Sequence, residues 1–222
     1  MDERAAERQR MVEKQLRPRG ISDIHVLAAM AEVPRHRFIP NELQDRAYDD
    51  GALPIAAGQT ISQPFIVALM AQELLIQPDD RVLEIGTGSG YAAAVLSRLA
   101  AQVYTVERYP ELAAAAQERF HELGYRNIQV RIGDGSLGWP EFAPYARISV
   151  AAAAPNVPKP LLDQLVDGGH LVLPLGSRDE QWLIRLTRKG PHIIEQRLCP
   201  VRFVPLVGDW GWNADHRSDN IL

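Results

Sequence analysis

The stretch from residue 82 to residue 96 constrains the fold more than any other. An apolar run at 82–85 breaks into Gly86, Gly88 and Gly90 and resumes as an alanine-rich stretch at 91–96. The run is typical of a buried strand, and the alanine-rich stretch of a helix packed on it. Glycine has no Cβ and tolerates positive φ, so a ligand can approach the turn and the first amides of the helix. The pattern predicts a strand, a glycine turn and a helix that hold a nucleotide-like ligand.

The alternation of strands and helices continues after the glycine turn. We expect strands at 102–106, 128–132, 147–151 and 170–175, with helices at 111–123 and 158–166, the second capped by Gly168 and Gly169. This order predicts an α/β fold with a doubly wound, mostly parallel sheet and helices on both faces. Strands expected at 182–186, 193–198 and 201–204 follow without helices, which indicates antiparallel strands at the C-terminal end.

The N-terminal part is predicted to be helical. A charged helix at 3–17 ends near Gly20, and Ser22 is expected to cap a second helix that stops at Pro34. Residues 49–64 show no periodicity and form a loop before a helix at 64–76. We therefore divide the chain into an N-terminal segment (1–64), a core (65–207) and a tail (208–222), which together make one compact domain.

Bulk properties exclude several classes of protein. The chain of 222 residues suits one domain with an added segment, and its formal net charge of −4 argues against a nucleic-acid surface. No apolar stretch reaches the ~18 residues that a membrane span needs. Cys199 is the single cysteine, so no internal disulfide can form. We expect a cytoplasmic protein that binds neither nucleic acid nor membrane.

Three predicted strands end in a carboxylate. Ligands of open α/β sheets bind at the carboxyl ends of the strands, so Glu84, Glu107 and Asp134 are candidate ligand-binding residues. Glu84 could orient the glycine turn or meet an amino-acid group of the ligand. Glu107 could accept both hydroxyls of a ribose, and Asp134 could accept an adenine amino group. Each carboxylate alone is more often a solvated charge, but together they favour a nucleotide-like cofactor.

Other site classes fit the residues poorly. The histidines are scattered, so we expect no metal site. Ser89 is not a nucleophile elbow, because that motif needs glycine where Thr87 and Tyr91 stand. The third glycine comes one residue too early for the dinucleotide fingerprint, which weakens a nicotinamide oxidoreductase. With Glu84 ahead, the spacing Glu-x-Gly-x-Gly-x-Gly instead resembles the first motif of S-adenosylmethionine-dependent methyltransferases.

A second motif makes the resemblance specific. Gly58-Gln59-Thr60-Ile61-Ser62-Gln63-Pro64 resembles the signature of the protein-L-isoaspartate(D-aspartate) O-methyltransferases, and it stands just before the cofactor strand as in that family. Supporting segments include 33–35, 53–55, 133–135 and 203–206, and the similarity spans about residues 11–207. The loop motif is far more specific than the glycine turn.

The resemblance implies a fold, a reaction and a set of site residues. The fold would be a seven-stranded Rossmann-like methyltransferase sheet in a monomer. The reaction would move a methyl group from S-adenosyl-L-methionine to the α-carboxylate of L-isoaspartyl residues in damaged proteins and peptides, leaving S-adenosyl-L-homocysteine. Ser62 would be the active-site serine, with Gln59, Thr60, Ile61, Val204 and Pro205 along the substrate. The cofactor would be held by Glu84, Gly86, Gly88, Ser89, Gly90, Glu107, Arg108, Asp134 and Gly135.

The chemistry agrees with these residue types. A carboxylate with a pKa of ~3 to 4 is ionised at neutral pH, so its methylation needs no general base. The site must chiefly hold oxygen, methyl and sulfur in line, and a hydroxyl that orients the carboxylate suffices. Ser62-Gln63-Pro64 before an apolar helix is also a good N-cap, so capping is an alternative role for Ser62.

Some positions depart from the family pattern. Ala56 and Ala57 stand where the family usually has a glycine and a variable residue, which would stiffen the loop. Ala146 and Ala151 replace a common aspartate and threonine at the two ends of the fourth strand. These departures leave two alternatives open: a methyltransferase with another acceptor, and a non-catalytic relative that binds isoaspartyl proteins or the cofactor.

Overall fold

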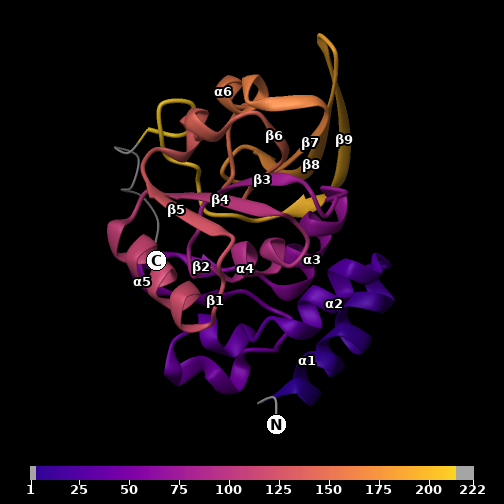
Figure 1. The fold of residues 1–222 in the computed structure, drawn as a ribbon, viewed down its shortest axis with the longest axis vertical. Coiled ribbons are helices and arrows are strands. Elements are labelled where there is room, and N and C mark those ends of the chain that lie inside the picture. Colours follow the sequence, from indigo (N-terminus) through magenta and orange to yellow (C-terminus); the bar gives the residue numbers. More distant parts are fainter. Residues whose placement is uncertain (1–3, 214–222) are drawn as a thin grey trace.

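The computed structural model describes residues 4–213 and is built around one large sheet (Figure 1). Its seven strands lie in the order β5-β4-β3-β6-β7-β8-β9. Their bounds are β3 Arg81–Ile85, β4 Gln102–Glu107, β5 Ile128–Ile132, β6 Tyr145–Val150, β7 Leu165–Gly176, β8 Gln181–Lys189 and β9 His192–Val201. The strands from β5 to β7 are parallel, and β8 and β9 pair antiparallel. The predicted α/β class, the seven strands and the antiparallel end are confirmed.

The strand order places a crevice beside the glycine turn. The chain runs outward from β3 through β4 to β5 and then returns to β6 on the other side of β3. Such a reversal opens a crevice at the carboxyl ends of the strands. Gly86 follows β3 and Ala151 follows β6, and the Ala151 amide donates to the carbonyl of Ile85 at 2.8 Å. The predicted cofactor turn therefore lies at the switch point of the sheet.

Helices cover both faces of the sheet, as the sequence predicts. They are α1 Ala5–Met11, α2 Ile24–Glu32, α3 Pro64–Glu73, α4 Tyr91–Ser97, α5 Pro110–Glu122 and α6 Lys159–Asp163, with a π-helix η1 Val12–Leu16 and short 3-10 helices η2 Arg17–Arg19, η3 Arg35–Phe38, η4 Asn41–Arg46, η5 Ala56–Gly58, η6 Gly135–Leu137 and η7 Pro140–Phe142. Figure 1 shows α3, α4 and α5 on one side of the sheet and α6 on the other. Two apolar clusters, one on each face, form the core.

The N-terminal helices are fastened to the helix that follows the glycine turn. Arg35 is fully buried, its Nε donates to the carbonyl of Ala47 at 2.8 Å, and its guanidinium lies 4.8 Å from the centre of the Tyr91 ring. Burial lowers the pKa of Arg35 because the charged form loses water. Phe38 packs edge-on against the same ring at 5.7 Å. Tyr91 begins α4, so these contacts tie the N-terminal segment to the wall of the crevice.

The loop at 49–64 contains a small hairpin that periodicity does not reveal. β1 (Leu53–Pro54) pairs antiparallel with β2 (Thr60–Ile61), each strand having two residues. The connection uses left-handed backbone at Ala57, with φ of 57°, and at Gly58, with φ of 62°. An alanine in this region is under steric strain. The hairpin holds Thr60 and Ile61 in place over the crevice.

Two of the predicted helix boundaries are wrong. Asp23, not Ser22, caps α2, because the Asp23 carboxylate accepts the amides of His25 at 2.8 Å and Val26 at 3.1 Å. Gly168 and Gly169 do not cap a helix: α6 ends at Asp163, and both glycines lie inside β7. The positive φ of Gly168, 76°, accompanies a register shift between β6 and β7.

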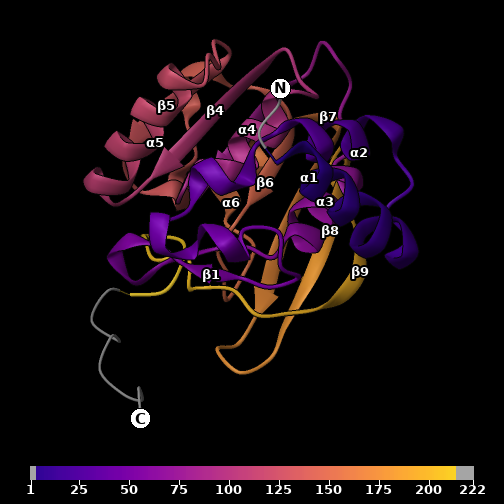
Figure 2. The same ribbon diagram turned by 90° about the horizontal axis from the view of Figure 1, so that it is seen from below.

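The predicted strand at 201–204 is also wrong. β9 runs without interruption to Val201, and the chain then leaves the sheet. The amide of Phe203 donates at 2.7 Å to the side-chain Oε1 of Gln181 in β8, rather than to the backbone of a strand. Figure 2 shows the chain after β9 crossing back towards the other edge of the sheet. Of the predicted tail at 208–222, residues 214–222 lie outside the described part of the chain.

Among residues 4–213, no helix combines the length and the apolar character that crossing a membrane requires.

Candidate active site

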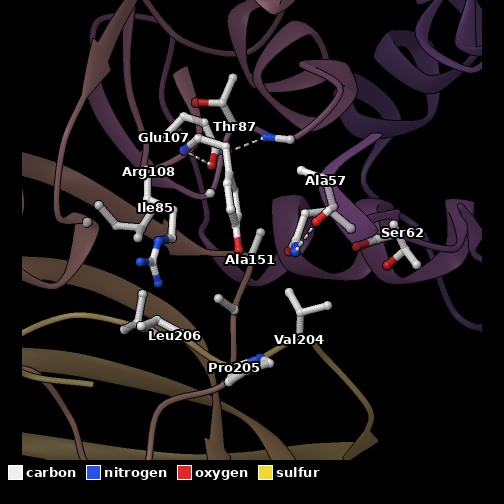
Figure 3. Close-up of a pocket in the computed structure, with 18 of the residues that line it drawn as sticks. Ala57, Ser62, Ile85, Thr87, Glu107, Arg108, Ala151, Val204, Pro205 and Leu206 are labelled. Atoms are coloured by element: carbon white, nitrogen blue, oxygen red, sulfur yellow. Dashed lines mark hydrogen bonds between the residues drawn. The ribbon is translucent and has the colours of Figure 1, made fainter. Parts of the chain in front are cut away.

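A cavity of about 500 Å³ opens at the carboxyl ends of β3, β4 and β6 (Figure 3). Most of the predicted site residues line it: Gln59, Thr60, Ile61, Ser62, Gly86, Gly88, Ser89, Glu107, Arg108, Gly135, Val204 and Pro205. Glu84, Gly90 and Asp134 do not line it. In Figure 3, Glu107 and Arg108 lie on one side of the cavity and Ser62 on the opposite side. Segments far apart in the sequence thus meet around one space.

Glu107 joins the glycine turn to the end of β4. Its Oε2 accepts the amide of Gly88 at 2.8 Å, and its Oε1 accepts the amide of Tyr109 at 3.0 Å. Burial raises the pKa of Glu107, while the backbone amides of Gly88 and Arg108 favour the ionised form. The carboxylate therefore fixes the turn and at the same time faces the cavity.

The glycines of the turn serve different purposes. All three have positive φ, 92° at Gly86, 53° at Gly88 and 89° at Gly90. A Cβ on Gly90 would lie 2.7 Å from the Phe120 ring, so this glycine allows α5 to pack on the turn. Gly86 and Gly88 instead face the cavity, where the missing side chains let a ligand approach the backbone.

Glu84 lies beneath the cavity at the end of a hydrogen-bonded chain. It is fully buried, and its Oε2 accepts the hydroxyl of Thr105 at 2.6 Å. The Thr105 hydroxyl lies 2.7 Å from that of Thr87, which lines the cavity. Desolvation raises the pKa of Glu84 to about 8, so it is protonated at neutral pH. No sequence motif indicates that Thr87 and Thr105 link Glu84 to the cavity.

Asp134 makes its contacts with protein groups. Oδ1 accepts the amide and the hydroxyl of Ser136, at 2.8 and 2.7 Å, so Asp134 caps the short helix η6. Oδ2 accepts the amide of Asp209 at 2.7 Å. The adenine-binding role stays a prediction.

Ser62 stands between two cavities. A second cavity, of about 760 Å³, is lined by residues such as Arg19, Phe65 and Arg202. Four residues line both cavities: Thr60, Ser62, Ala151 and Val204. The two spaces therefore meet at this junction, and the Ser62 hydroxyl belongs to both.

The structure does not support helix capping by Ser62. The residue at the N-cap of α3 is Gln63, and no side chain caps this end of the helix. Within the described residues the Ser62 hydroxyl forms no hydrogen bond, which leaves it available to a ligand.

Sequence reasoning missed several residues that line the first cavity. They include Thr87, Tyr91, Tyr109, Ala152, Arg178 and Asn213. Arg178 comes from the β7–β8 connection and Asn213 from the C-terminal segment, and no motif of the sequence brings either to the glycine turn.

Comparison with known proteins identifies the family. The sequence model described as "Protein-L-isoaspartate(D-aspartate) O-methyltransferase" matches residues 6–211. The chain belongs to this family. A protein-L-isoaspartate O-methyltransferase of Herpetosiphon aurantiacus is 58% identical over 206 residues, which are 93% of this chain and 92% of that protein. One of Roseiflexus castenholzii is 53% identical over 210 residues, 95% and 96% of the two chains.

Solved structures of the family share the fold. A protein-L-isoaspartate O-methyltransferase structure superposes with a TM-score of 0.83 at 31% identity, covering 92% of this chain and 67% of that one. A Plasmodium falciparum structure of the family, in complex with S-adenosyl-L-homocysteine, gives a TM-score of 0.80 at 27% identity, covering 90% and 98%. The family's methyl donor is S-adenosylmethionine, and the recognition made from the two motifs is confirmed.

The first cavity suits this donor. The turn at 86–90 exposes backbone where side chains would block a nucleoside, and Glu107 offers carboxylate oxygens beside it. Within the described range 4–213, no group of three His, Cys, Asp or Glu side chains is placed to bind a metal ion.

Proposed function

We propose that the chain methylates the α-carboxylate of L-isoaspartyl residues in damaged proteins and peptides, with the donor in the first cavity and the acceptor in the second. The junction at Ser62 carries this proposal, because Thr60, Ser62, Ala151 and Val204 line both spaces. A methyl group can pass between two ligands only where their sites meet. The family membership supports the same reaction.

The chain supplies position rather than acid or base catalysis. Bound S-adenosylmethionine supplies an electrophilic methyl group on a sulfonium. One acceptor oxygen forms the new bond to carbon, the sulfur keeps the electron pair of the broken bond, and no proton moves. Ser62 donates its hydroxyl hydrogen to the acceptor carboxylate and orients it. Correct alignment of this kind contributes up to ~7 to 11 kcal/mol.

The predicted cofactor residues divide between contact and support. Glu107 would accept the ribose hydroxyls, while Gly86, Gly88 and Ser89 would present backbone along the cofactor. Glu84 and Gly90 would support the turn from below, because neither lines the cavity. Val204 and Pro205 form the wall that continues from the junction and would lie along the acceptor peptide.

The second cavity is suited to an acceptor that carries a peptide. Its wall includes Arg19, which bridges to Asp50 at 3.0 Å and lies 3.5 Å from the centre of the Phe65 ring. Gln63 also donates to the Asp50 carboxylate, at 2.8 Å. These contacts connect the wall of the second cavity to Gln63, the residue after Ser62.

Methyl transfer to matched peptides tests the function. Labelled S-adenosylmethionine is incubated with an isoaspartyl peptide and its aspartyl isomer, and we expect labelling of the first only. Ser62→Ala should lower kcat by about 100-fold or more and leave the Kd of S-adenosylhomocysteine within about twofold. Ser22→Ala, which removes an exposed hydroxyl from a residue that lines neither cavity, is the matched control.

Three outcomes would contradict the proposal. Equal labelling of both peptides would indicate another acceptor. Cofactor binding without labelling of either would indicate a non-catalytic relative. Unchanged turnover in Ser62→Ala would remove the role of the hydroxyl.

We also propose a cytoplasmic monomer that engages neither nucleic acid nor membrane. The mild net charge of −4 and the single cysteine support this assignment. Light scattering coupled to size exclusion would contradict the monomer if the mass exceeded the 24.7 kDa of one chain.

A further inference from the structure

The chain after β9 folds into a closed turn, here named the C-terminal strap, residues 206–213. Its ends are held together by the amide of Trp212, which donates to the carbonyl of Leu206 at 2.7 Å, and by the amide of Gly208, which donates to the carbonyl of Trp212 at 3.2 Å. Leu206, Val207 and Asn213 line the first cavity, from here on called the cofactor cavity because it is proposed to hold the donor. The strap is therefore one wall of that cavity.

Two side chains next to β5 hold the strap in place. Oδ2 of Asp134 accepts the amide of Asp209 at 2.7 Å, and the hydroxyl of Ser136 accepts the amide of Trp210 at 3.0 Å. Ser136 is fully buried and donates its own hydrogen to Oδ1 of Asp134 at 2.7 Å. Asp134 and Ser136 thus act as one unit that satisfies two consecutive amides of the strap.

The glycines of the strap show how closely it is seated. A Cβ on Gly208 would overlap the carboxylate of Asp134, and one on Gly211 would overlap the carbonyl of Leu206. Neither position has room for a side chain without movement of the strap. Close approach to Asp134, rather than an unusual φ, requires glycine at position 208.

The far end of the strap is docked on the other side of the cavity. Nε1 of Trp212 donates to the carbonyl of Ala153 at 3.1 Å, and the guanidinium of Arg178 lies 5.4 Å from the Trp212 ring. Ala153 follows β6, whereas Asp134 follows β5. Figures 1 and 2 both show the chain after β9 crossing back past the central strands towards the β5 side of the sheet. The strap spans the part of the crevice where the cofactor turn lies.

We propose that Asp134 and Ser136 are positioning residues that latch the C-terminal strap across the cofactor cavity, and that the strap limits the release of the cofactor. This inference rests on the proposed function in one respect, that the first cavity holds the donor. Three protein donors already occupy the Asp134 carboxylate, which has about four acceptor positions. The latch accounts for the bond from the Asp209 amide and for the bond that orients the Ser136 hydroxyl.

Release of S-adenosylhomocysteine measures the latch directly. The labelled compound is bound to the full chain and chased with excess unlabelled compound. Gly208→Ala places a methyl group against Asp134, and Ser136→Ala removes the acceptor of the Trp210 amide. Each should speed dissociation about five- to tenfold or more, the size expected for the loss of one or two hydrogen bonds.

A neighbouring substitution provides the matched control. Asp209→Ala alters an exposed side chain but keeps the backbone amide that Asp134 accepts, so dissociation should stay at the wild-type rate. The urea midpoint of the unbound protein distinguishes latching from general destabilisation, because Gly208→Ala should move the rate and leave the midpoint nearly unchanged.

Wild-type release in Gly208→Ala and Ser136→Ala would overturn the latch, as would equally fast release in Asp209→Ala. Failure of the isoaspartyl assay alone would leave the latch standing, because the chase needs no acceptor. Absence of S-adenosylhomocysteine binding to the wild-type chain would overturn the latch and the assignment of the cavity together.

Discussion

Glu84 is the fully buried carboxyl beneath the cofactor turn. Because it is protonated in the folded state, the free energy of unfolding should fall as the pH rises. Its Oε2 is bonded to Thr105, and in the described part of the chain its Oε1 has no hydrogen-bond partner. Glu84→Gln mimics the shape of the protonated acid and cannot ionise. Comparison of the two proteins therefore isolates the cost of charging this site.

The structure gives the sign and the size of the effect. Burial raises the pKa of Glu84 from 4.5 to about 8, with Thr105 opposing and Glu107 adding to the shift. Between these values the folded state holds a proton that the unfolded chain releases, so unfolding becomes easier as the pH rises. The contribution of Glu84 to the free energy of unfolding is largest below pH 4.5. It falls by about 1 kcal/mol per pH unit between pH 4.5 and pH 8 and is constant above pH 8. The loss at pH 7 is on the order of 3 kcal/mol.

Urea unfolding of both proteins without cofactor measures this loss. Between pH 5.5 and 7.5 the wild type should lose about 2 to 3 kcal/mol of unfolding free energy more than Glu84→Gln does. Any pH-independent effect of the glutamine side chain on stability cancels, because only the change between the two pH values is compared. Titration of His170, whose pKa burial lowers to about 4, is common to both proteins and cancels as well. A difference that does not change with pH would refute the argument, because Glu84 would then be ionised in the folded state.

Three further substitutions test the turn, the hairpin and the junction. Gly90→Ala sets a methyl group 2.7 Å from Phe120 at a φ of 89°, and should cost about 2 to 4 kcal/mol in urea unfolding; a cost below 1 would contradict the packing role. Ala57→Gly relieves left-handed strain and should stabilise the protein by up to about 1 kcal/mol, whereas a lower melting temperature would contradict this. Ala151→Thr adds a hydroxyl where both cavities meet, and should change the KM for the isoaspartyl peptide while the Kd of S-adenosylhomocysteine shifts less; the reverse pattern would place residue 151 on the donor side only.

The sheet was predictable because its signals are local. Each central strand is an apolar run followed by a turn, and alternation with helices settles the parallel topology. The errors occur where a distant contact decides. Ser22 and Asp23 are both good caps, and only the position of the backbone selects Asp23. Gly168 looks like a helix stop, but pairing with β6 draws it into β7.

The site was predictable in its motifs and not in its connections. Glu107 and Ser62 belong to short patterns, and the structure brings both to one cavity. Thr87 lies in the glycine turn after β3 and Thr105 lies in β4, 18 residues further along the chain, so their link to Glu84 exists only after β3 and β4 pair. The C-terminal strap is less predictable still, because its partner Asp134 lies 75 residues before Asp209.

In the proposed arrangement, the donor and the acceptor are recognised in different cavities that meet at Ala151. Gly86 lines the first cavity, and its Cα hydrogen faces Ala151, since a Cβ there would lie 3.5 Å from the Ala151 side chain. Ala151 in turn lines both cavities together with Ser62. A change at residue 151 can therefore alter the acceptor side without touching the carboxylate of Glu107. Residue 151, where the sequence resemblance implies a threonine, follows β6, and we expect a change there to shift acceptor preference more than donor binding.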